Sequence, residues 1–469
     1  MAYGSNRLQN IYFALPSTAK DIFASVYGIK QRKERYGRTY YSHLEFLRLS
    51  QFWDHKKVRE YQEKMLVEFV NKSLYFNRYY KTNYDTIPIG GIHDLSILPI
   101  LQKSTVRTYR KDIINTDNIP CKWSHTSGTT GSALIFPISL NAFQKEYAFR
   151  ALHYEWSGVG LHTRDPIAIC AGHPVAHPSK NTPPFWVHDW ANNWIFFSSY
   201  HMTESNLRYY VKELENFDPV MIHGYPSSMY LLSKAFKKFG SRLSRLRSVY
   251  TSSETLMDFQ RTAIEESFQV KVFNWYGTSE MTTNIVECEM GELHLKPEHS
   301  FTEILNNRNE LCMPGETGRI VATNFSNDAF PLIRYDIGDE VVIAKNQTSK
   351  CGRCGTLIEK VSGRKEDYII TPDGRIIGRL DHLFKDSLNV IEAQIEQNQP
   401  ESVILRIVKN ELYNKKDEAN IMEEAVLRMG ASIKIEFDYV TEIPRTKNGK
   451  FRFILSTMNK GNIEKNESK

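Results

Sequence analysis

Residues 271–280 of this 469-residue chain read Lys-Val-Phe-Asn-Trp-Tyr-Gly-Thr-Ser-Glu. The first five residues form a short apolar run, which predicts a buried strand. The side chains that follow at its carboxyl end are those of Tyr276, Thr278, Ser279 and Glu280. Open α/β sheets bind their ligands at this edge. Because a ring can stack on a base, hydroxyls can hold phosphate and a carboxylate can bring in Mg²⁺, the segment predicts a nucleotide site.

Similar short apolar runs recur between residues 121 and 343. Examples are residues 166–170, 219–223, 246–250 and 319–324. They alternate with longer polar or amphipathic stretches, a pattern typical of a layered α/β domain with much parallel sheet. Residues 46–81 instead carry apolar side chains at helical spacing, so they predict a helical N-terminal region.

The order of the predicted secondary-structure elements changes near residue 363. A charged hairpin at 368–377, a strand at 403–408, a helix at 415–429 and a strand at 433–439 together describe a small α+β domain. We therefore expect two domains. A large N-terminal layered α/β domain would cover residues 1–363, and the small C-terminal domain would cover residues 364–469.

Composition restricts the class of protein. The chain is longer than one core usually supports, and 41% hydrophobic residues are enough to fill several layers. The net charge of +6 permits anionic ligands without requiring nucleic acid, so we expect no nucleic acid partner. No apolar run is long enough to span a membrane, and residues 1–10 lack the apolar core of a signal peptide. We expect a soluble, cytoplasmic protein with no integral membrane segment.

A second informative segment is residues 124–132, which read Ser-His-Thr-Ser-Gly-Thr-Thr-Gly-Ser. Glycines let a backbone approach phosphate closely, while hydroxyls and successive N–H groups donate to its oxygens. The run lacks the lysine of a Walker loop. Taken alone, it fits either a phosphate-binding loop or a solvent-exposed turn. The candidate phosphate ligands are Thr126, Ser127, Gly128, Thr129, Thr130 and Gly131.

Three further motifs follow along the chain. They are Arg-Tyr-Asp-Ile-Gly-Asp at 334–339, Gly-Arg-Lys-Glu-Asp at 363–367 and Pro-Arg-Thr-Lys-Asn-Gly-Lys at 444–450. In this order and spacing, the five segments resemble the adenylate-forming superfamily of acyl-CoA synthetases, peptide-synthetase adenylation domains and luciferases. The resemblance spans most of the chain. It implies an AMP-forming ligase that uses ATP and Mg²⁺, with a mobile C-terminal domain that rotates about a hinge at Asp367.

The resemblance also implies roles for single residues. Residues 126–131 would hold the ATP phosphates, Tyr276 would stack on adenine and Glu280 would bind Mg²⁺. Asp339 would accept hydrogen bonds from the ribose hydroxyls. Lys450 would be the catalytic residue that bridges the substrate carboxylate and the α-phosphate, where it offsets the developing negative charge. The nucleotide-binding residues implied outside the loop are Tyr276, Gly277, Thr278, Ser279, Asp339 and Arg364.

Two pairs of residues suggest a metal centre. Cys288-x5-His294 and Cys351-x2-Cys354 supply three thiols and one imidazole, the ligand set of a closed structural Zn²⁺ site. The two pairs are far apart in sequence and can meet only in the tertiary structure. Similarity to the phenylacetate-CoA-ligase-like branch, where such a site occurs, favours zinc. The alternative is a set of buried cysteines with an unrelated surface histidine.

Within that branch, the chain is most similar to the CapK-type proteins of capsule and cell-surface polysaccharide biosynthesis. The residues that carry this similarity are 223–228, 252–256 and 367–380. Authentic phenylacetate-CoA ligases have an Arg-Gly-rich loop after the hinge that helps to form the thioester-stage site. Here a Thr-Pro-Asp-Gly hairpin stands at 371–374 instead. The similarity therefore implies activation of a small carboxylic acid and its transfer to an amine, such as an amino sugar or a sugar nucleotide.

Two alternatives remain open. The acceptor could be CoA, which would make the protein an acyl- or aryl-CoA ligase of the phenylacetate-CoA ligase type. From a different class, the chain could be a non-catalytic, zinc-stabilised binding protein with a vestigial nucleotide site.

Overall fold

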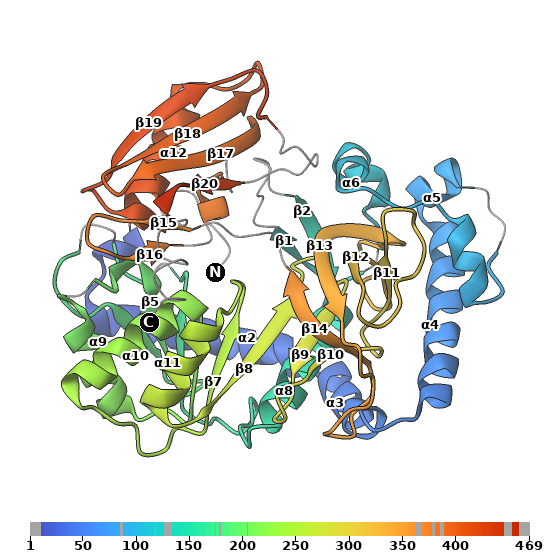
Figure 1. Cartoon of the computed structure of the whole chain (residues 1–469), viewed down its shortest axis with the longest axis horizontal. Coiled ribbons are helices and arrows are strands. Elements are labelled where there is room, and N and C mark those ends of the chain that lie inside the picture. The colour runs from blue at the N-terminus through green and yellow to red at the C-terminus, as the bar shows by residue number, and fades with distance from the viewer. Residues whose placement is uncertain are drawn as a thin grey trace.

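The structure, a computed structural model, describes most of the chain (Figure 1). The described residues are 11–84, 88–117, 119–125, 134–173, 175–177, 180–203, 205–362, 368–377, 380–384, 389–444 and 453–458. The predicted phosphate loop at 126–131, the predicted ribose contact Arg364, the predicted hinge Asp367 and the predicted catalytic Lys450 lie outside these ranges. Their assignments remain predictions.

Helices form the N-terminal region, as its apolar spacing predicts. They are α2 (Ser17–Arg35), α3 (Arg38–Ser50), α4 (His55–Phe76), α5 (Arg78–Asn83), η1 (Ile92–Ile97), α6 (Lys103–Thr108) and α7 (Arg110–Ile113). The predicted stretch 46–81 is divided because two polar residues cap new helices within it. Asp54 accepts from the backbone N–H of Lys57 at the start of α4, and Asn77 accepts from Tyr79 at the start of α5.

One large mixed sheet forms the centre of the fold. Within the described residues it has twelve strands in the order β11-β12-β13-β14-β10-β9-β8-β7-β6-β3-β5-β4. Their bounds are β3 Ile167–Ala171, β4 Trp186–Asp189, β5 Trp194–Ser198, β6 Met221–Gly224, β7 Ser248–Ser252, β8 Lys271–Gly277, β9 Asn284–Glu287, β10 Leu293–Leu295, β11 Ser300–Leu305, β12 Thr317–Asn324, β13 Tyr335–Ile343 and β14 Thr356–Ser362. Strands β5, β3, β6, β7 and β8 are parallel, so their carboxyl ends share one edge.

Helices cover both faces of the parallel strands, which explains their continuous apolar runs. Helices α9 (Leu207–Phe217), α10 (Pro226–Phe239) and α11 (Asp258–Phe268) pack against one face, together with Ile222 and Val249. Helix α8 (Leu140–Glu155) packs with α3 against the other face, together with Met221 and Tyr250. Neighbouring residues of a strand alternate between these two cores, so each of their side chains is buried. Truncating one of these side chains, as in Ile222→Ala, should lower the free energy of unfolding by about 2–5 kcal/mol.

A short hairpin stands apart from the large sheet. Strand β1 (Cys121–His125) runs antiparallel to β2 (Ile135–Ser139), and His125 lies opposite Ile135. The segment predicted to bind phosphate therefore joins the two strands of this hairpin.

The C-terminal residues form a smaller sheet of their own (Figure 1, red and orange). Strands β17 (Val390–Gln399), β18 (Ser402–Lys409), β19 (Lys434–Tyr439) and β20 (Ile454–Ser456) lie in the order β19-β18-β17-β20. Helix α12 (Lys415–Met429) packs on this sheet. A hairpin of β15 (Ile369–Ile370) and β16 (Ile376–Ile377), followed by η3 (Leu380–Phe384), precedes it.

The α/β fold class is thus confirmed, and the hairpin, the first predicted strand, the helix and the second predicted strand are present. No helix in the described ranges has the length and apolar character needed to cross a membrane.

Candidate active site

The first functional pair lies at the carboxyl end of the parallel strands. The hydroxyl of Tyr276, at the end of β8, donates to Oδ2 of Asp339 in β13 at 2.8 Å. The two residues are 63 positions apart in sequence. The structure therefore brings together the residue predicted to stack on adenine and the residue predicted to accept from ribose, with an aromatic ring held beside a carboxylate.

A turn after β8 carries the predicted Mg²⁺ ligand. Thr278 closes the turn, because its carbonyl accepts from Met281 N at 3.0 Å and its Oγ1 accepts from Thr282 N at 3.0 Å. Gly277 and Ser279, also predicted to bind nucleotide, are exposed beside it. Glu280, in contrast, is only 6% exposed. The turn thus presents small polar groups outward and directs one carboxylate inward.

Two side chains hold Glu280. The hydroxyl of Tyr335 donates to its Oε1 at 3.0 Å, and Nζ of Lys103 lies 3.7 Å from the same oxygen. A buried carboxylate needs such a partner charge. Lys103 was missed by sequence analysis. It is carried to the site because Leu101, two residues before it, hydrogen-bonds with the backbone of Arg334 and Asp336 at the start of β13, which no local pattern reveals.

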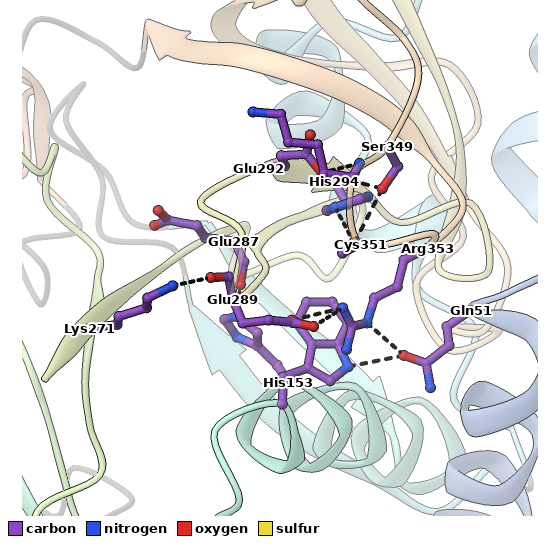
Figure 2. Close-up of polar contacts among 12 residues, drawn as sticks. Gln51, His153, Lys271, Glu287, Glu289, Glu292, His294, Ser349, Cys351 and Arg353 are labelled. Atoms are coloured by element: carbon purple, nitrogen blue, oxygen red, sulfur yellow. Dashed lines mark hydrogen bonds and ion pairs between the residues drawn. The ribbon is translucent and has the colours of Figure 1, made fainter.

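A second cluster lies where the β9–β10 turn meets the loop between β13 and β14 (Figure 2). One donor atom from each of Cys288, Glu292, His294 and Cys351 lies within 4.8 Å of the others. Nε2 of His294 is 3.3 Å from Sγ of Cys351. Two thiols, an imidazole and a carboxylate are a ligand set suited to Zn²⁺.

The structure brings together three of the four predicted zinc ligands, with Glu292 in the fourth position. Sγ of Cys354 points elsewhere and lies 3.4 Å from the carbonyl of Ser50. Oε2 of Glu292 accepts from the backbone N–H of Lys350 at 2.9 Å and from Ser349 Oγ at 3.3 Å. These contacts direct the carboxylate toward the loop that carries Cys351.

The electrostatics of the cluster suit a cation. Burial lowers the pKa of His294 to about 4, so the imidazole is neutral at pH 7, as a metal ligand must be. Burial raises the pKa of the Cys288 thiol to about 12. Burial also opposes ionisation of Cys351, but hydrogen bonds from Ser349 and Arg353 outweigh it and lower the pKa of that thiol. A dication would stabilise both thiolates.

Arg353 fixes the loop next to the cluster. Its Nη1 donates to both oxygens of Glu289 at 2.8 Å, and its Nε donates to Oε1 of Gln51, the residue after α3, at 3.0 Å (Figure 2). Its guanidinium also lies 4.2 Å from the ring centre of Trp156. Arg353 therefore helps to attach the loop between β13 and β14 to the N-terminal helices.

Comparison with known proteins finds relatives along nearly the whole chain. A sequence profile described as the CapK C-terminal domain matches residues 369–457. Protein CapK of Staphylococcus aureus is 25% identical over 464 residues, which cover 96% of this chain and 100% of that protein. A phenylacetate-coenzyme A ligase of Thermus thermophilus is 23% identical over 447 residues, covering 85% of this chain and 96% of that protein.

Among solved structures, 2-hydroxyisobutyryl-CoA ligase in complex with 2-HIB-AMP and CoA in the thioesterification state has the same fold. Its TM-score is 0.55 at 16% identity, over 90% of this chain and 94% of that chain. The chain belongs to the adenylate-forming superfamily of ligases. Within that superfamily, its similarity to CapK extends along nearly the whole chain and includes the C-terminal domain.

Proposed function

We propose that this protein activates a small carboxylic acid with ATP, forming an acyl-adenylate and releasing pyrophosphate, and then transfers the acyl group to an amine. The observation that supports this most directly is the convergence of Tyr276, Asp339 and Glu280 at one edge of the sheet. A base, a ribose and a phosphate-bound Mg²⁺ require an aromatic ring, an acceptor and a carboxylate respectively.

In the adenylation step, the substrate carboxylate would attack the α-phosphorus and pyrophosphate would leave. Glu280 would hold Mg²⁺ against the phosphate oxygens, and residues 126–131 would donate to the departing phosphates. Lys450 would offset the charge on the transferring group. In that role the lysine would belong to a domain that can move away before the acyl group is transferred.

The amine acceptor is supported by the hairpin that follows β15. Thr371 N donates to the carbonyl of Arg375 at 3.0 Å, and Gly374 takes a positive φ of 78° to close the turn. Arg375 then donates to the carbonyl of Tyr200 in the large domain at 3.2 Å. This docked turn stands where phenylacetate-CoA ligases have an Arg-Gly-rich loop for the thioester stage. CoA is the second candidate, because two relatives are named as CoA ligases.

A carboxylate-dependent ATP–pyrophosphate exchange assay over a panel of acids tests adenylation. Lys450→Ala should reduce exchange by about 100-fold or more while ATP binding persists, because the lysine would act chiefly in the transition state. Lys447→Ala, in the same segment, serves as the control. Normal exchange in Lys450→Ala would contradict the assignment. Hydroxylamine, an amino sugar or CoA is then added as acceptor to the adenylation reaction. The acceptor that becomes acylated identifies the second step.

We also propose that the Cys288, Glu292, His294 and Cys351 cluster holds a structural Zn²⁺. With four protein ligands it would have no open position for substrate. Its role would be to hold the β9–β10 turn against the β13–β14 loop. The rival view, a non-catalytic zinc-stabilised binding protein, predicts metal content without exchange activity on any acid.

A further inference from the structure

Two arginines share one tyrosine ring beside the candidate active site. Arg35 ends α2 and Arg150 belongs to α8, and the two helices are in contact. Their guanidinium carbons lie 4.6 Å and 5.3 Å from the ring centre of Tyr147. Arg150 also lies 6.0 Å from the ring centre of Trp275. Trp275 packs with the core that α8 covers, so Arg150 lies on the α8 face of the strand whose carboxyl end carries Tyr276.

These two positive charges are matched by little negative charge. Arg150 pairs with Oε1 of Glu146 at 3.7 Å, which is longer than a hydrogen bond. The other oxygen of Glu146 lies 3.1 Å from Nε2 of His299. In the part of the chain that the structure describes, the buried Nε of Arg35 has no hydrogen-bond partner. The carboxylate next to it in sequence, Glu34, is paired with Lys122. Glu146 thus pairs with both Arg150 and His299, while Arg35, whose charge acts on the buried carboxylate of Asp189, keeps its Nε unpaired among the described residues.

Three neutral side chains, joined by hydrogen bonds, lie on the same side of the sheet as the two arginines. The hydroxyl of Tyr154 is 2.6 Å from Nδ1 of His223, a length typical of an O–H donor. Nε2 of His223 is 3.0 Å from Oγ of Ser252, a length typical of an N–H donor. Burial lowers the pKa of His223 to about 3, so its ring is neutral. Tyr154, His223 and Ser252 therefore form a chain of neutral hydrogen-bonding groups, at whose end Oγ of Ser252 lies 3.4 Å from Oγ of Ser253.

The register of the sheet places these groups together. Ser252 of β7 pairs with Trp275 of β8, and His223 of β6 pairs with Tyr250 of β7. Tyr250 packs in the core that α8 covers, so alternate residues of these strands face α8. Ser252 also lies at the carboxyl end of its strand, where α/β sheets bind ligands. The next residue, Ser253, has a positive φ of 75°, and such strain in a non-glycine residue concentrates at functional sites.

We propose that Arg35, Arg150 and Ser252 form the acid-binding site and select an acid that carries a second carboxylate. The guanidinium groups pair with the second carboxylate, and Ser252 donates to the body of the acid. The reacting carboxylate then points toward Tyr276 and Glu280. A guanidinium fork matches a carboxylate in shape as well as charge. An arylacetate, which has no second carboxylate, would desolvate the arginines without providing a partner. The inference rests on the proposed function.

Exchange assays with a series of short dicarboxylates, each compared with its own monoamide, test this selection. The monoamide has nearly the same size but lacks the second charge. The wild type should prefer the dicarboxylate by about 10- to 100-fold in kcat/KM, as expected for a charge-assisted hydrogen bond. Arg150→Gln and Arg35→Gln should bring the ratio close to one by losing activity on the dicarboxylate alone. Arg32→Gln, on the same helix as Arg35, should keep the wild-type ratio.

A binding measurement separates this inference from the proposed function. Dicarboxylates should raise the unfolding midpoint of the wild type more than their monoamides do, and this difference should vanish in Arg150→Gln. Exchange that is equal for both members of every pair, or a preference that survives both arginine substitutions, overturns the inference while adenylation stands. Arg150-dependent binding without exchange on any acid supports the anion site and counts against adenylation. If the binding of dicarboxylates does not depend on Arg150, the proposed acid-binding site is wrong.

Discussion

Nη1 of Arg428 donates a 2.7 Å hydrogen bond to the hydroxyl of Tyr200, and its guanidinium lies 5.2 Å from the centre of that ring. Arg428 belongs to α12 of the C-terminal domain, whereas Tyr200 belongs to η2 (Ser199–His201) of the large domain. Tyr200 also donates to the carbonyl of Gly172, which follows β3. One tyrosine therefore joins the small domain to the carboxyl edge of the large sheet.

Tyr200→Phe should loosen this domain contact. Loss of a hydrogen bond to a charged group costs about 1.5–3 kcal/mol, so opening of the contact should become about 10- to 100-fold more frequent. Hydrogen exchange of α12 and of residues 199–203 measures it. Tyr209→Phe is a matched control, because that hydroxyl also accepts from an arginine, Arg208, but on the exposed surface of α9. Equal exchange in the two variants would contradict the role of Tyr200.

The metal cluster predicts different results for its two nearby cysteines. Cys351→Ser should lose the bound Zn²⁺, whereas Cys354→Ser should retain about one equivalent, because Cys354 faces the Ser50 carbonyl. Glu292→Gln should weaken binding. Metal analysis of the purified proteins and their unfolding midpoints check this. Loss of metal from Cys354→Ser with retention in Glu292→Gln would restore the ligand set expected from sequence.

Glu280 and Lys103 should have opposite effects on the Mg²⁺ requirement. Glu280→Gln should reduce exchange by about 100-fold, since the metal would lose its protein carboxylate. Lys103→Met should lower the Mg²⁺ concentration needed for half-maximal exchange by about several-fold, because the ammonium competes for Oε1 of Glu280 at 3.7 Å. Titration of Mg²⁺ at fixed ATP measures both. A higher Mg²⁺ requirement in Lys103→Met would show that the lysine assists the metal.

Acid should destabilise the protein through His153. Burial lowers the pKa of this histidine from 6.5 to about 3, so the folded state keeps it neutral while the unfolded state takes up a proton. Its stabilising contribution is complete above pH 6.5 and is lost as the pH falls below that value. By pH 5 the loss is about 2 kcal/mol, at about 1.4 kcal/mol per pH unit for one proton.

Urea unfolding of the wild type and of His153→Gln across this pH range checks the effect. The variant should lose less stability as the pH falls, while Gln can still donate to the carbonyl of Glu287 as Nε2 of His153 does. His55→Gln, at an exposed position, controls for the substitution itself. If the wild type and His153→Gln gave parallel pH curves, the proton would be taken up elsewhere.

The parallel part of the fold follows from sequence because its strands are buried on both faces. Met221 and Ile222 are adjacent, face opposite cores and are both fully buried. Strand β17 gives no such signal, since much of it is polar. Gln397 on that strand is buried only because its amide exchanges two hydrogen bonds with the backbone of Ile370, at 2.8 Å and 2.6 Å. That pairing is visible only after the chain has folded.

The candidate site residues that belong to one short segment could be predicted from the sequence. Tyr276 lies at the end of one strand and Glu280 follows it, and Asp339 lies in a recognisable motif of its own. Lys103 and Glu292 could not be found in this way. Lys103 reaches Glu280 through backbone pairing of Leu101 with β13, and Glu292 is selected over Cys354 by the direction of side chains on two separate loops. Such choices depend on distances between distant segments, which spacing along the chain does not contain.

Strand β14 is fixed at one end and continues into the C-terminal domain at the other. Before it begins, Arg353 is attached to Gln51 and Glu289, and Cys354 N donates to the carbonyl of Gln51 at 2.7 Å. Along its length it pairs with β10 and β13 up to Ser362. In mechanical terms it is a cantilever: a twist applied at Ser362 is resisted by the pairing along the whole strand.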